Sequence, residues 1–167
     1  MKIVLAPDSF KGSLSSAQAA AAMARGVHRV MPKARCISVP MADGGEGTVR
    51  ALVVATGGRL HYKQVHGPDG RPVRACYGIT GDGKTAVIEM AQASGLTLLG
   101  KHQRSPLKTS SYGTGELILA ALQKKVRRII IGLGGSATND AGAGMAQALG
   151  VRFQDSKGRI IRRRAAG

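Results

Sequence analysis

Apolar runs of two different periods alternate along the first third of the chain. Residues 2–7 form a short apolar run that predicts a strand, and residues 15–30 carry apolar side chains at helical spacing. A second strand is predicted over residues 35–40, and a glycine-rich turn at 43–45 introduces a second helix. Strands separated by helices are typical of a parallel sheet that binds ligands beyond the carboxyl ends of its strands.

The alternation changes after about residue 66. Residues 67–70 (Gly-Pro-Asp-Gly) are a strong turn signal, and the segments around this turn alternate like strands of an antiparallel sheet. These expected strands cover residues 60–65, 73–80 and 85–90. A helix is predicted at 114–125. We therefore expect a domain boundary near residue 66, with residues 1–66 and 67–167 in different domains.

A glycine-rich segment from Gly132 to Met145 follows a buried run of isoleucines. It predicts a strand that enters a tight turn and then a helix continuing through Leu149. Glycines let a phosphate approach the backbone, and the N–H groups of the turn and of the first helical turn would point toward it. The segment also carries hydroxyl, amide and carboxylate side chains, those of Ser136, Thr138, Asn139 and Asp140. This mixture favours a phosphorylated ligand with its metal ion. The alternative is a strand-to-helix connection capped by Asn139 or Asp140.

Residues 78–85 fit the phosphate-binding pattern G-x-x-x-x-G-K-[ST] letter for letter. That pattern binds phosphate where a helix begins at its lysine. Here residues 85–90 are largely apolar with β-branched side chains, which indicates a strand, and residues 81–84 are typical of a hairpin turn. We therefore interpret this segment as a hairpin and not as a nucleotide site.

Three more segments combine glycine with hydroxyl and charged side chains. Residues 8–13 follow the first strand, residues 43–48 open the second helix, and residues 109–116 open the third. Asp8 and Asp43 each lie just beyond a predicted strand end, so a parallel sheet would bring both into one crevice. Helix capping could explain any one of these segments. Four independent turns of the same composition are better explained by a ligand site.

The chain is strongly basic, and its few acids are concentrated. It has 25 Lys and Arg residues against nine Asp and Glu, a net charge of +16. Such a charge suits nucleic acid, but the basic residues are scattered and no aromatic side chains are interleaved with them. Five of the nine acids lie in the glycine-rich or hydroxyl-rich segments, namely Asp8, Asp43, Glu46, Glu116 and Asp140. This distribution favours metal and phosphate binding over nucleic-acid binding.

Cys36 and Cys76 lie on predicted strands without a CxxC spacing, which indicates reduced core residues of a cytoplasmic protein. The first residues lack the apolar region of a signal peptide, because Pro7 and Asp8 interrupt it at once. No apolar run reaches the length of about 18 residues that a membrane span requires. We expect a cytoplasmic protein without membrane contact.

Four segments of this sequence, in their order and spacing, resemble the motifs of the bacterial glycerate kinases. They are residues 6–14, 43–48, 109–116 and 132–145, and the resemblance runs from Met1 to about Arg159. It implies transfer of a phosphoryl group from ATP to D-glycerate, with Mg²⁺. It also implies an α/β fold in which a second domain is inserted into a Rossmann-like one. Residues 1–66 would be the first part of the Rossmann-like parallel sheet domain, and residues 67–167 part of the inserted α+β domain.

Phosphoryl transfer needs positioning and charge neutralisation more than covalent chemistry, which suggests a role for each segment. Asp43 is the candidate magnesium ligand or the base that accepts the glycerate hydroxyl proton, and Asp8 is the second candidate. Lys11 would neutralise the transferring phosphate or pair with the glycerate carboxylate. The nucleotide phosphates are assigned to Gly132, Gly134, Gly135, Ser136, Ala137, Thr138, Asn139 and Asp140. Further substrate contacts are expected from Ser9, Gly44, Gly45 and Thr114, and a further metal contact from Asp140.

The sequence also departs from that family. Members of the family are longer, and their later glycine-rich segments have no counterpart here, where the chain continues into Arg162–Arg164 and ends in Ala-Ala-Gly. This ending predicts a fragment or an altered reading frame. A partial sheet would expose edges that favour self-association. Two other functions remain open, a non-catalytic remnant and a basic nucleic-acid-binding protein.

Overall fold

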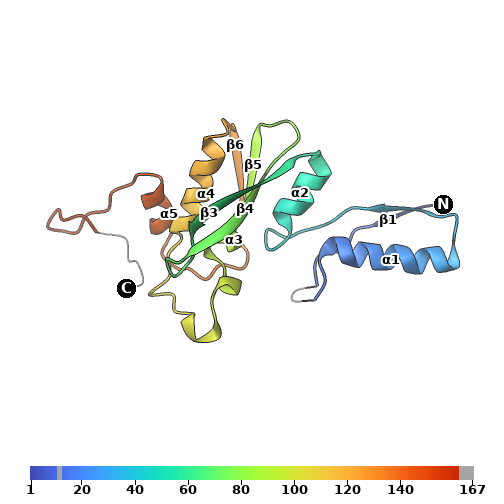
Figure 1. Ribbon diagram of the computed structural model, residues 1–167, viewed down its shortest axis with the longest axis horizontal. Helices are drawn as coiled ribbons and strands as arrows, with labels where there is room; N and C mark the ends of the chain where they lie inside the picture. The colour runs from blue at the N-terminus through green and yellow to red at the C-terminus, as the bar shows by residue number, and fades with distance from the viewer. Residues whose placement is uncertain (11–12, 162–167) are drawn as a thin grey trace.

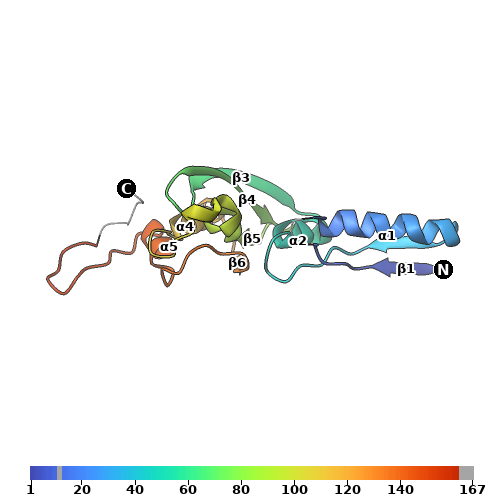
Figure 2. The ribbon, with the colours of Figure 1, turned by 90° about the horizontal axis from the view of Figure 1, so that it is seen from below.

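The computed structural model describes residues 1–10 and 13–161, and it contains two sheets (Figure 1, Figure 2). The smaller sheet pairs β1 (Lys2–Leu5) with β2 (Arg35–Ser38) in parallel. α1 (Ser16–Val30) connects the two strands. This unit is the strand–helix–strand arrangement that the apolar pattern predicts.

The start and packing of α1 follow from its sequence. The Ser15 hydroxyl accepts the N–H of Gln18, and the Gln18 side chain accepts the N–H of Ser15 in return. This reciprocal capping satisfies two donors that would otherwise be unpaired at the helix start. The buried residues of α1 are Ala19 and Ala20, and Leu5 is the buried residue of β1. Small side chains therefore let the helix lie close to the strand pair.

The larger sheet has four strands in the order β3–β4–β5–β6. They are β3 (Arg59–His66), β4 (Pro72–Ile79), β5 (Thr85–Glu89) and β6 (Arg128–Gly132). β4 is antiparallel to both β3 and β5, as the sequence predicts, whereas β6 pairs with β5 in parallel. A tight turn joins β4 to β5, where the Thr80 hydroxyl donates to Asp82 at 2.6 Å. β5 follows directly, which confirms the hairpin interpretation of residues 78–85.

Helices cover both faces of the larger sheet. The remaining helices are α2 (Thr48–Thr56), α3 (Ala91–Ser94), α4 (Tyr112–Leu122) and α5 (Ala143–Ala148), with the 3-10 turns η1 (Leu96–Leu98) and η2 (Lys101–Gln103). On one face, Val49 of α2 shares a core with Val87 of β5. On the other, Leu117 of α4 shares a core with Ile88. Because adjacent residues of a strand point to opposite faces, every residue of β5 is buried.

Two helices differ in extent from the prediction. α4 begins at Tyr112 and ends at Leu122, slightly earlier at both ends than expected. α5 begins only at Ala143, because an irregular loop from Leu133 to Gly142 replaces the expected tight turn. Within residues 1–10 and 13–161, no helix is long and apolar enough to cross a lipid bilayer.

The division between the two sheets lies between β2 and α2. β3 pairs with β4 from Arg59 to His66, and α2 packs on β4 and β5. The boundary expected near residue 66 therefore does not coincide with this division, because the turn at 67–70 joins two strands of one sheet. Figure 2 shows the β1–α1–β2 unit extending from one end of the larger unit. The mixed architecture, with a parallel strand pair in each sheet, agrees with the expected α/β class.

Candidate functional site

Two glycine-rich segments meet backbone to backbone at the end of β6. The N–H of Gly134 donates to the carbonyl of Gly44 at 3.1 Å. A Cβ on Gly132 would lie 2.4 Å from the Gly44 oxygen, and one on Gly134 would lie 2.7 Å from the Cα of Gly45. Side chains of any size would separate the two segments, which explains glycine at these positions. The structure thus brings the 43–48 and 132–140 segments together.

Asp43 is held at the surface of this junction. Its Oδ1 accepts the N–H of Gly45 at 3.0 Å, and the Thr48 hydroxyl donates to the Gly45 carbonyl at 2.8 Å. Gly44 and Gly47 adopt φ values of +92° and +99°, which favour glycine. The turn therefore fixes one carboxylate oxygen of Asp43, while Oδ2 has no protein donor among the described residues.

Asp8 lies on the segment that runs beside the one carrying Asp43. The N–H of Met41 donates to the carbonyl of Pro7 at 3.3 Å, so the parallel pairing of β1 and β2 continues toward both acids. The exposed Asp8 accepts the N–H of Ser9 at 2.6 Å. Ser9 lines a cavity of about 600 Å³ together with residues 46–47 of the acidic turn. Lys11 lies outside the described residues.

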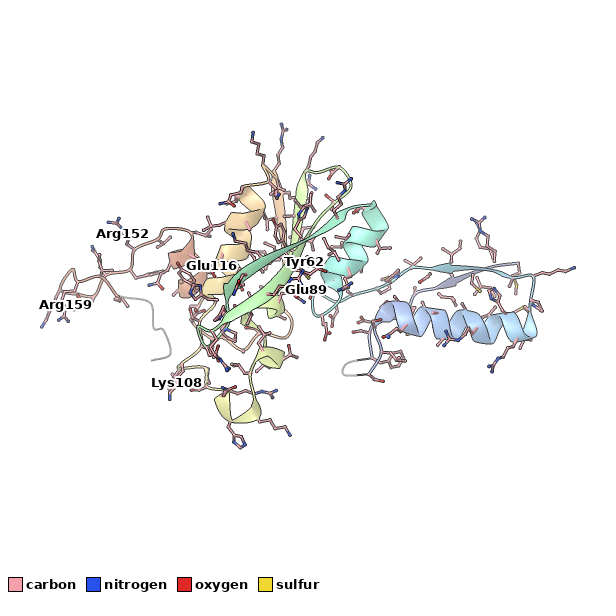
Figure 3. The ribbon with its side chains drawn as sticks, viewed as in Figure 1. Tyr62, Glu89, Lys108, Glu116, Arg152 and Arg159 are labelled. Atoms are coloured by element: carbon pink, nitrogen blue, oxygen red, sulfur yellow. The ribbon has the colours of Figure 1, made fainter. Side chains whose placement is uncertain are left out.

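Glu89 is a buried carboxylate at this junction that the sequence analysis did not select. It ends β5 opposite Gly132 of β6, and it is only 2% exposed. Its Oε1 accepts the N–H of Val49 at 2.8 Å, at the start of α2, and its Oε2 accepts the side-chain amide of Gln92 at 3.3 Å. Figure 3 shows Glu89 beside α2. A negative charge is favoured at a helix N-terminus, so Glu89 anchors the helix that follows the acidic turn.

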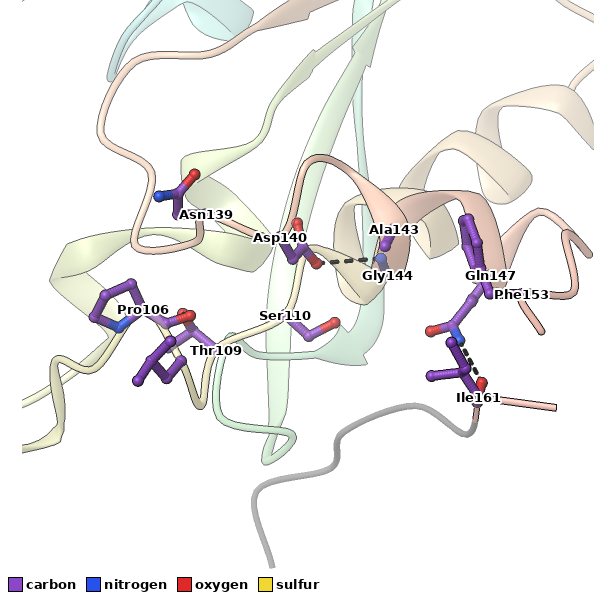
Figure 4. A pocket seen from close by; sticks show the side chains of 11 residues that line it. Pro106, Thr109, Ser110, Asn139, Asp140, Ala143, Gly144, Gln147, Phe153 and Ile161 are labelled. Carbon is purple, nitrogen blue, oxygen red and sulfur yellow. Dashed lines mark hydrogen bonds between the residues drawn. The ribbon is translucent and has the colours of Figure 1, made fainter. Parts of the chain in front are cut away.

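Asp140 organises the loop after β6 from within (Figure 4). Its Oδ2 accepts the N–H and O–H of Ser111 at 2.8 and 2.9 Å and the N–H of Gly144 at 3.1 Å, and its Oδ1 accepts the N–H of Gly142 at 3.1 Å. Burial alone would raise the pKa of this carboxyl. The donors of Ser111, Gly144 and Gly142 outweigh burial and hold the pKa below its usual value. Protein donors therefore occupy the carboxylate that was expected to contact a metal.

The 109–116 segment packs against the same loop. The Thr109 hydroxyl donates to the carbonyl of Ala137 at 2.8 Å, and the Ser111 hydroxyl accepts the N–H of Met145 at 2.9 Å. Thr114, expected to touch substrate, is 1% exposed, and its hydroxyl bonds that of Ser94 at 2.8 Å. It lies at the floor of the cavity that Ser136 and Thr138 also line, with its hydroxyl already bonded within the protein.

Glu116 lies on α4, away from the loop (Figure 3). One of its oxygens accepts the backbone N–H of His66 at 2.7 Å, and its carboxylate lies 2.9 Å from Nδ1 of the same residue. These contacts join α4 to β3. Glu116 thus has a structural partner on a distant strand, whereas Asp43 is bonded to Gly45 of its own turn.

The backbone donors open to a ligand lie within the expected 132–140 segment and not in the first turn of α5. The N–H groups from Gly142 to Met145, which begin α5, are bonded to Asp140 and Ser111. Those of Gly135, Ser136 and Asn139 have no acceptor among the described residues. The hydroxyls of Ser136 and Thr138 lie 3.0 Å apart and line a cavity of about 370 Å³ beside these donors. A small anion would find unpaired backbone donors there.

The free carboxylate oxygens of Asp43 and Asp8 suit a hard cation that takes its other ligands from a bound substrate. No group of three or more His, Cys, Asp or Glu side chains within the described part of the chain could hold a metal ion. Mg²⁺ is commonly held by one or two carboxylates together with substrate phosphates. Asp43 and Asp8 each keep one oxygen without a protein donor among the described residues. The residues present therefore fit a magnesium ion that arrives with a phosphorylated ligand.

The chain is similar to known proteins over almost its whole length. The family model described as Glycerate kinase family matches residues 3–167. The Glycerate 2-kinase of Escherichia coli K12 is 56% identical over 161 residues, which are 96% of this chain and 42% of that protein. The Glycerate kinase of Bacillus subtilis 168 is 60% identical over the same length and shares. The chain thus spans less than half the length of these relatives.

A solved structure gives the same result for the fold. The crystal structure of a protein assigned as glycerate kinase 2 from Salmonella typhimurium LT2 superposes with a TM-score of 0.84 at 56% identity. The match covers 96% of this chain and 43% of that one. With the family match over residues 3–167, these similarities confirm the resemblance found in the four motifs. The chain belongs to the glycerate kinase family.

Proposed function

We propose that this chain forms the part of a D-glycerate kinase that binds ATP and presents the acid for catalysis. The observation that carries the proposal is the backbone contact between the acidic turn at 43–48 and the glycine-rich loop after β6. It puts a carboxylate with a free oxygen next to a loop with unpaired backbone donors. Phosphoryl transfer requires such an arrangement of an acid and a phosphate cradle.

In this proposal the loop after β6 binds the nucleotide phosphates. The donors are the N–H groups of Gly135, Ser136 and Asn139, with the hydroxyls of Ser136 and Thr138 beside them. Gly132 and Gly134 serve by letting the acidic turn approach. Asp140 holds the loop in shape, so we assign it neither to metal nor to substrate.

Asp43 is the proposed base that accepts the proton of the glycerate hydroxyl, or a ligand of Mg²⁺, with Asp8 as the second candidate for either role. When bound, Mg²⁺ would neutralise charge on the phosphates. Lys11 would pair with the glycerate carboxylate or the transferring phosphate. Ser9, Gly44 and Gly45 remain candidates for substrate contact, whereas the buried Thr114 is left out.

We also propose a cytoplasmic location for the protein, because ATP is abundant in the cytoplasm and Cys36 and Cys76 are free thiols.

For the domains, we propose a boundary within residues 39–47 in place of residue 66. This segment joins the two sheets and also carries Asp43. A ligand bound at the acidic turn would then lie where the two units meet. The cavity lined by Ser9 and residues 46–47 lies at the same place.

The test is D-glycerate-dependent release of ADP by the 167-residue chain with ATP and magnesium. We expect turnover that Asp43→Asn abolishes and that Asp82→Asn, at an exposed acid in the turn between β4 and β5, leaves unchanged. Turnover that survives Asp43→Asn removes Asp43 from the mechanism. Nucleotide binding without turnover supports a non-catalytic remnant instead.

The net charge of +16 keeps nucleic-acid binding as the second candidate. It predicts affinity for duplex DNA that falls steeply with salt and does not respond to ATP. Binding of DNA at physiological salt, together with absence of nucleotide binding, would favour it over the kinase.

A further inference from the structure

A second cavity, of about 390 Å³, is lined in part by the loop after β6 (Figure 4). We call it the base cavity, and it is enclosed by the loop before α4, by α5 and by the C-terminal hairpin. The hairpin is closed by the bridge between Gln154 and Ile160 and by the N–H of Ile161 donating to Phe153 at 2.8 Å. Segments from three parts of the sequence therefore build this cavity.

The walls of the base cavity are mainly apolar. Leu107 and Pro106 form one side, Phe153 and Ile161 another, and Ala143 with its small side chain contributes from α5. None of the described lining residues is a lysine or arginine. A carboxylate or a phosphate would find no cationic partner among them, whereas a flat neutral ring would gain apolar contact on entering.

The polar lining of the cavity comprises two amide side chains and the side chains of Thr109, Ser110 and Asp140. The amide of Asn139 has no hydrogen-bond partner among the described residues, and Gln147 uses only its Nε2, which donates to the carbonyl of Ile161 at 3.1 Å. An amide group can both donate and accept along the N6/N7 edge of adenine. The cavity thus offers apolar walls with amide groups at the edge, the combination that a purine requires.

The base cavity adjoins the proposed phosphate site, because the two cavities share lining residues. Asn139 and Asp140 line both this cavity and the cavity that contains Ser136 and Thr138. A ligand with a flat ring at one end and phosphates at the other would lie across Asn139, with its phosphates at the unpaired N–H groups. Mononucleotides have this form.

We propose that the base cavity binds the adenine ring of the nucleotide, with Leu107 and Phe153 against the ring and Asn139 at its amino edge. The inference rests on the proposed use of ATP, and it adds a base-specific site that the glycine-rich motifs do not contain. Leu107 and Phe153 belong to none of the four motifs, so the sequence alone does not indicate them.

The test is binding of the fluorescent analogue mant-ATP to the 167-residue chain, with adenosine, inosine and tripolyphosphate as competitors. Leu107 is 77% exposed, so Leu107→Asp alters the wall without burying a charge in the core. We expect it to weaken adenosine at least about tenfold, the loss of part of a leucine contact, and to leave competition by tripolyphosphate unchanged. Asn139→Ala should remove the preference for adenosine over inosine.

Ile160→Asp is the matched control. Ile160 is 58% exposed on the same hairpin and does not line the cavity, so this variant adds the same charge nearby and should bind like wild type. Equal adenosine binding in wild type and Leu107→Asp, or equal loss in both variants, overturns the inference. Wild type that binds tripolyphosphate but not adenosine overturns the base cavity and leaves the phosphate site intact. Wild type that binds neither contradicts both proposals.

Discussion

The contact between Gly132 and Gly44 gives the sharpest prediction about the candidate site. A Cβ at position 132 would lie 2.4 Å from the Gly44 oxygen, well inside the 3.0 Å that real Cβ contacts respect. The obstacle is backbone, so no side-chain rotation can relieve it. Either the acidic turn moves away or the end of β6 distorts, and overpacking of this kind costs about 1–3 kcal/mol. Gly132→Ala should therefore lower the free energy of unfolding by about that amount.

The matched control is Gly26→Ala. Gly26 lies inside α1 with nothing within 4 Å of an added Cβ. Alanine is more favourable than glycine in a helix interior, so this substitution should stabilise by about 0.5–1 kcal/mol. Urea unfolding followed by circular dichroism measures both variants, and mant-ATP binding reports whether the loop still holds its shape. Equal stability of the two variants, with nucleotide binding retained in Gly132→Ala, would refute the close approach of the two loops.

Three further predictions concern buried charge, pH and association. Glu89→Ala leaves the Val49 N–H without its acceptor and should cost about 1–3 kcal/mol in urea unfolding, whereas Glu89→Gln keeps an acceptor and should cost less; equal costs would show that the carboxylate oxygen is not the anchor. Because the pKa of Asp140 is lowered on folding, its stabilisation is present above its unfolded pKa and is lost as pH falls through the folded pKa. Asp140→Asn should flatten that acid limb of the stability curve, and an unchanged limb would contradict the assignment. Val4 is 58% exposed on β1, so Val4→Lys should shift the chain toward monomer in sedimentation velocity; a wild-type chain that sediments like the variant would contradict association through β1.

Most of the elements follow from local sequence. The helical spacing of residues 15–30 and the turn at 67–70 act over a few residues, and the structure has the helix and the hairpin that they predict. The same local logic separated residues 78–85 from a phosphate-binding loop, because the β-branched residues after Lys84 favour a strand. The position of β6 in the larger sheet could not be predicted in this way, because its parallel pairing with β5 joins residues far apart in the sequence.

The turn at residues 67–70 shows that one local signal is compatible with two arrangements of the chain. Residues 67–70 mark a reversal of the chain, and a reversal can either end a domain or join two strands of one sheet. The eight-residue register between β3 and β4 decides for the second. That register depends on cross-strand pairs such as Tyr62 with Cys76, which no window of local sequence contains.

The candidate site shows the same limit at the level of single side chains. Asp43 and Asp140 look alike in the sequence, since each is an acid in a glycine-rich segment beyond a strand. They differ in the structure because Ser111, 29 residues before Asp140, brings two donors to its Oδ2, whereas Asp43 is bonded only within its own turn. A carboxylate whose oxygens are both bonded within the fold and one that keeps an oxygen without a donor among the described residues therefore occur in similar segments and differ in a distant partner. Glu89 depends on a distant partner in the same way, because its neighbours in sequence are apolar and its role at the start of α2 is set by Val49, 40 residues away.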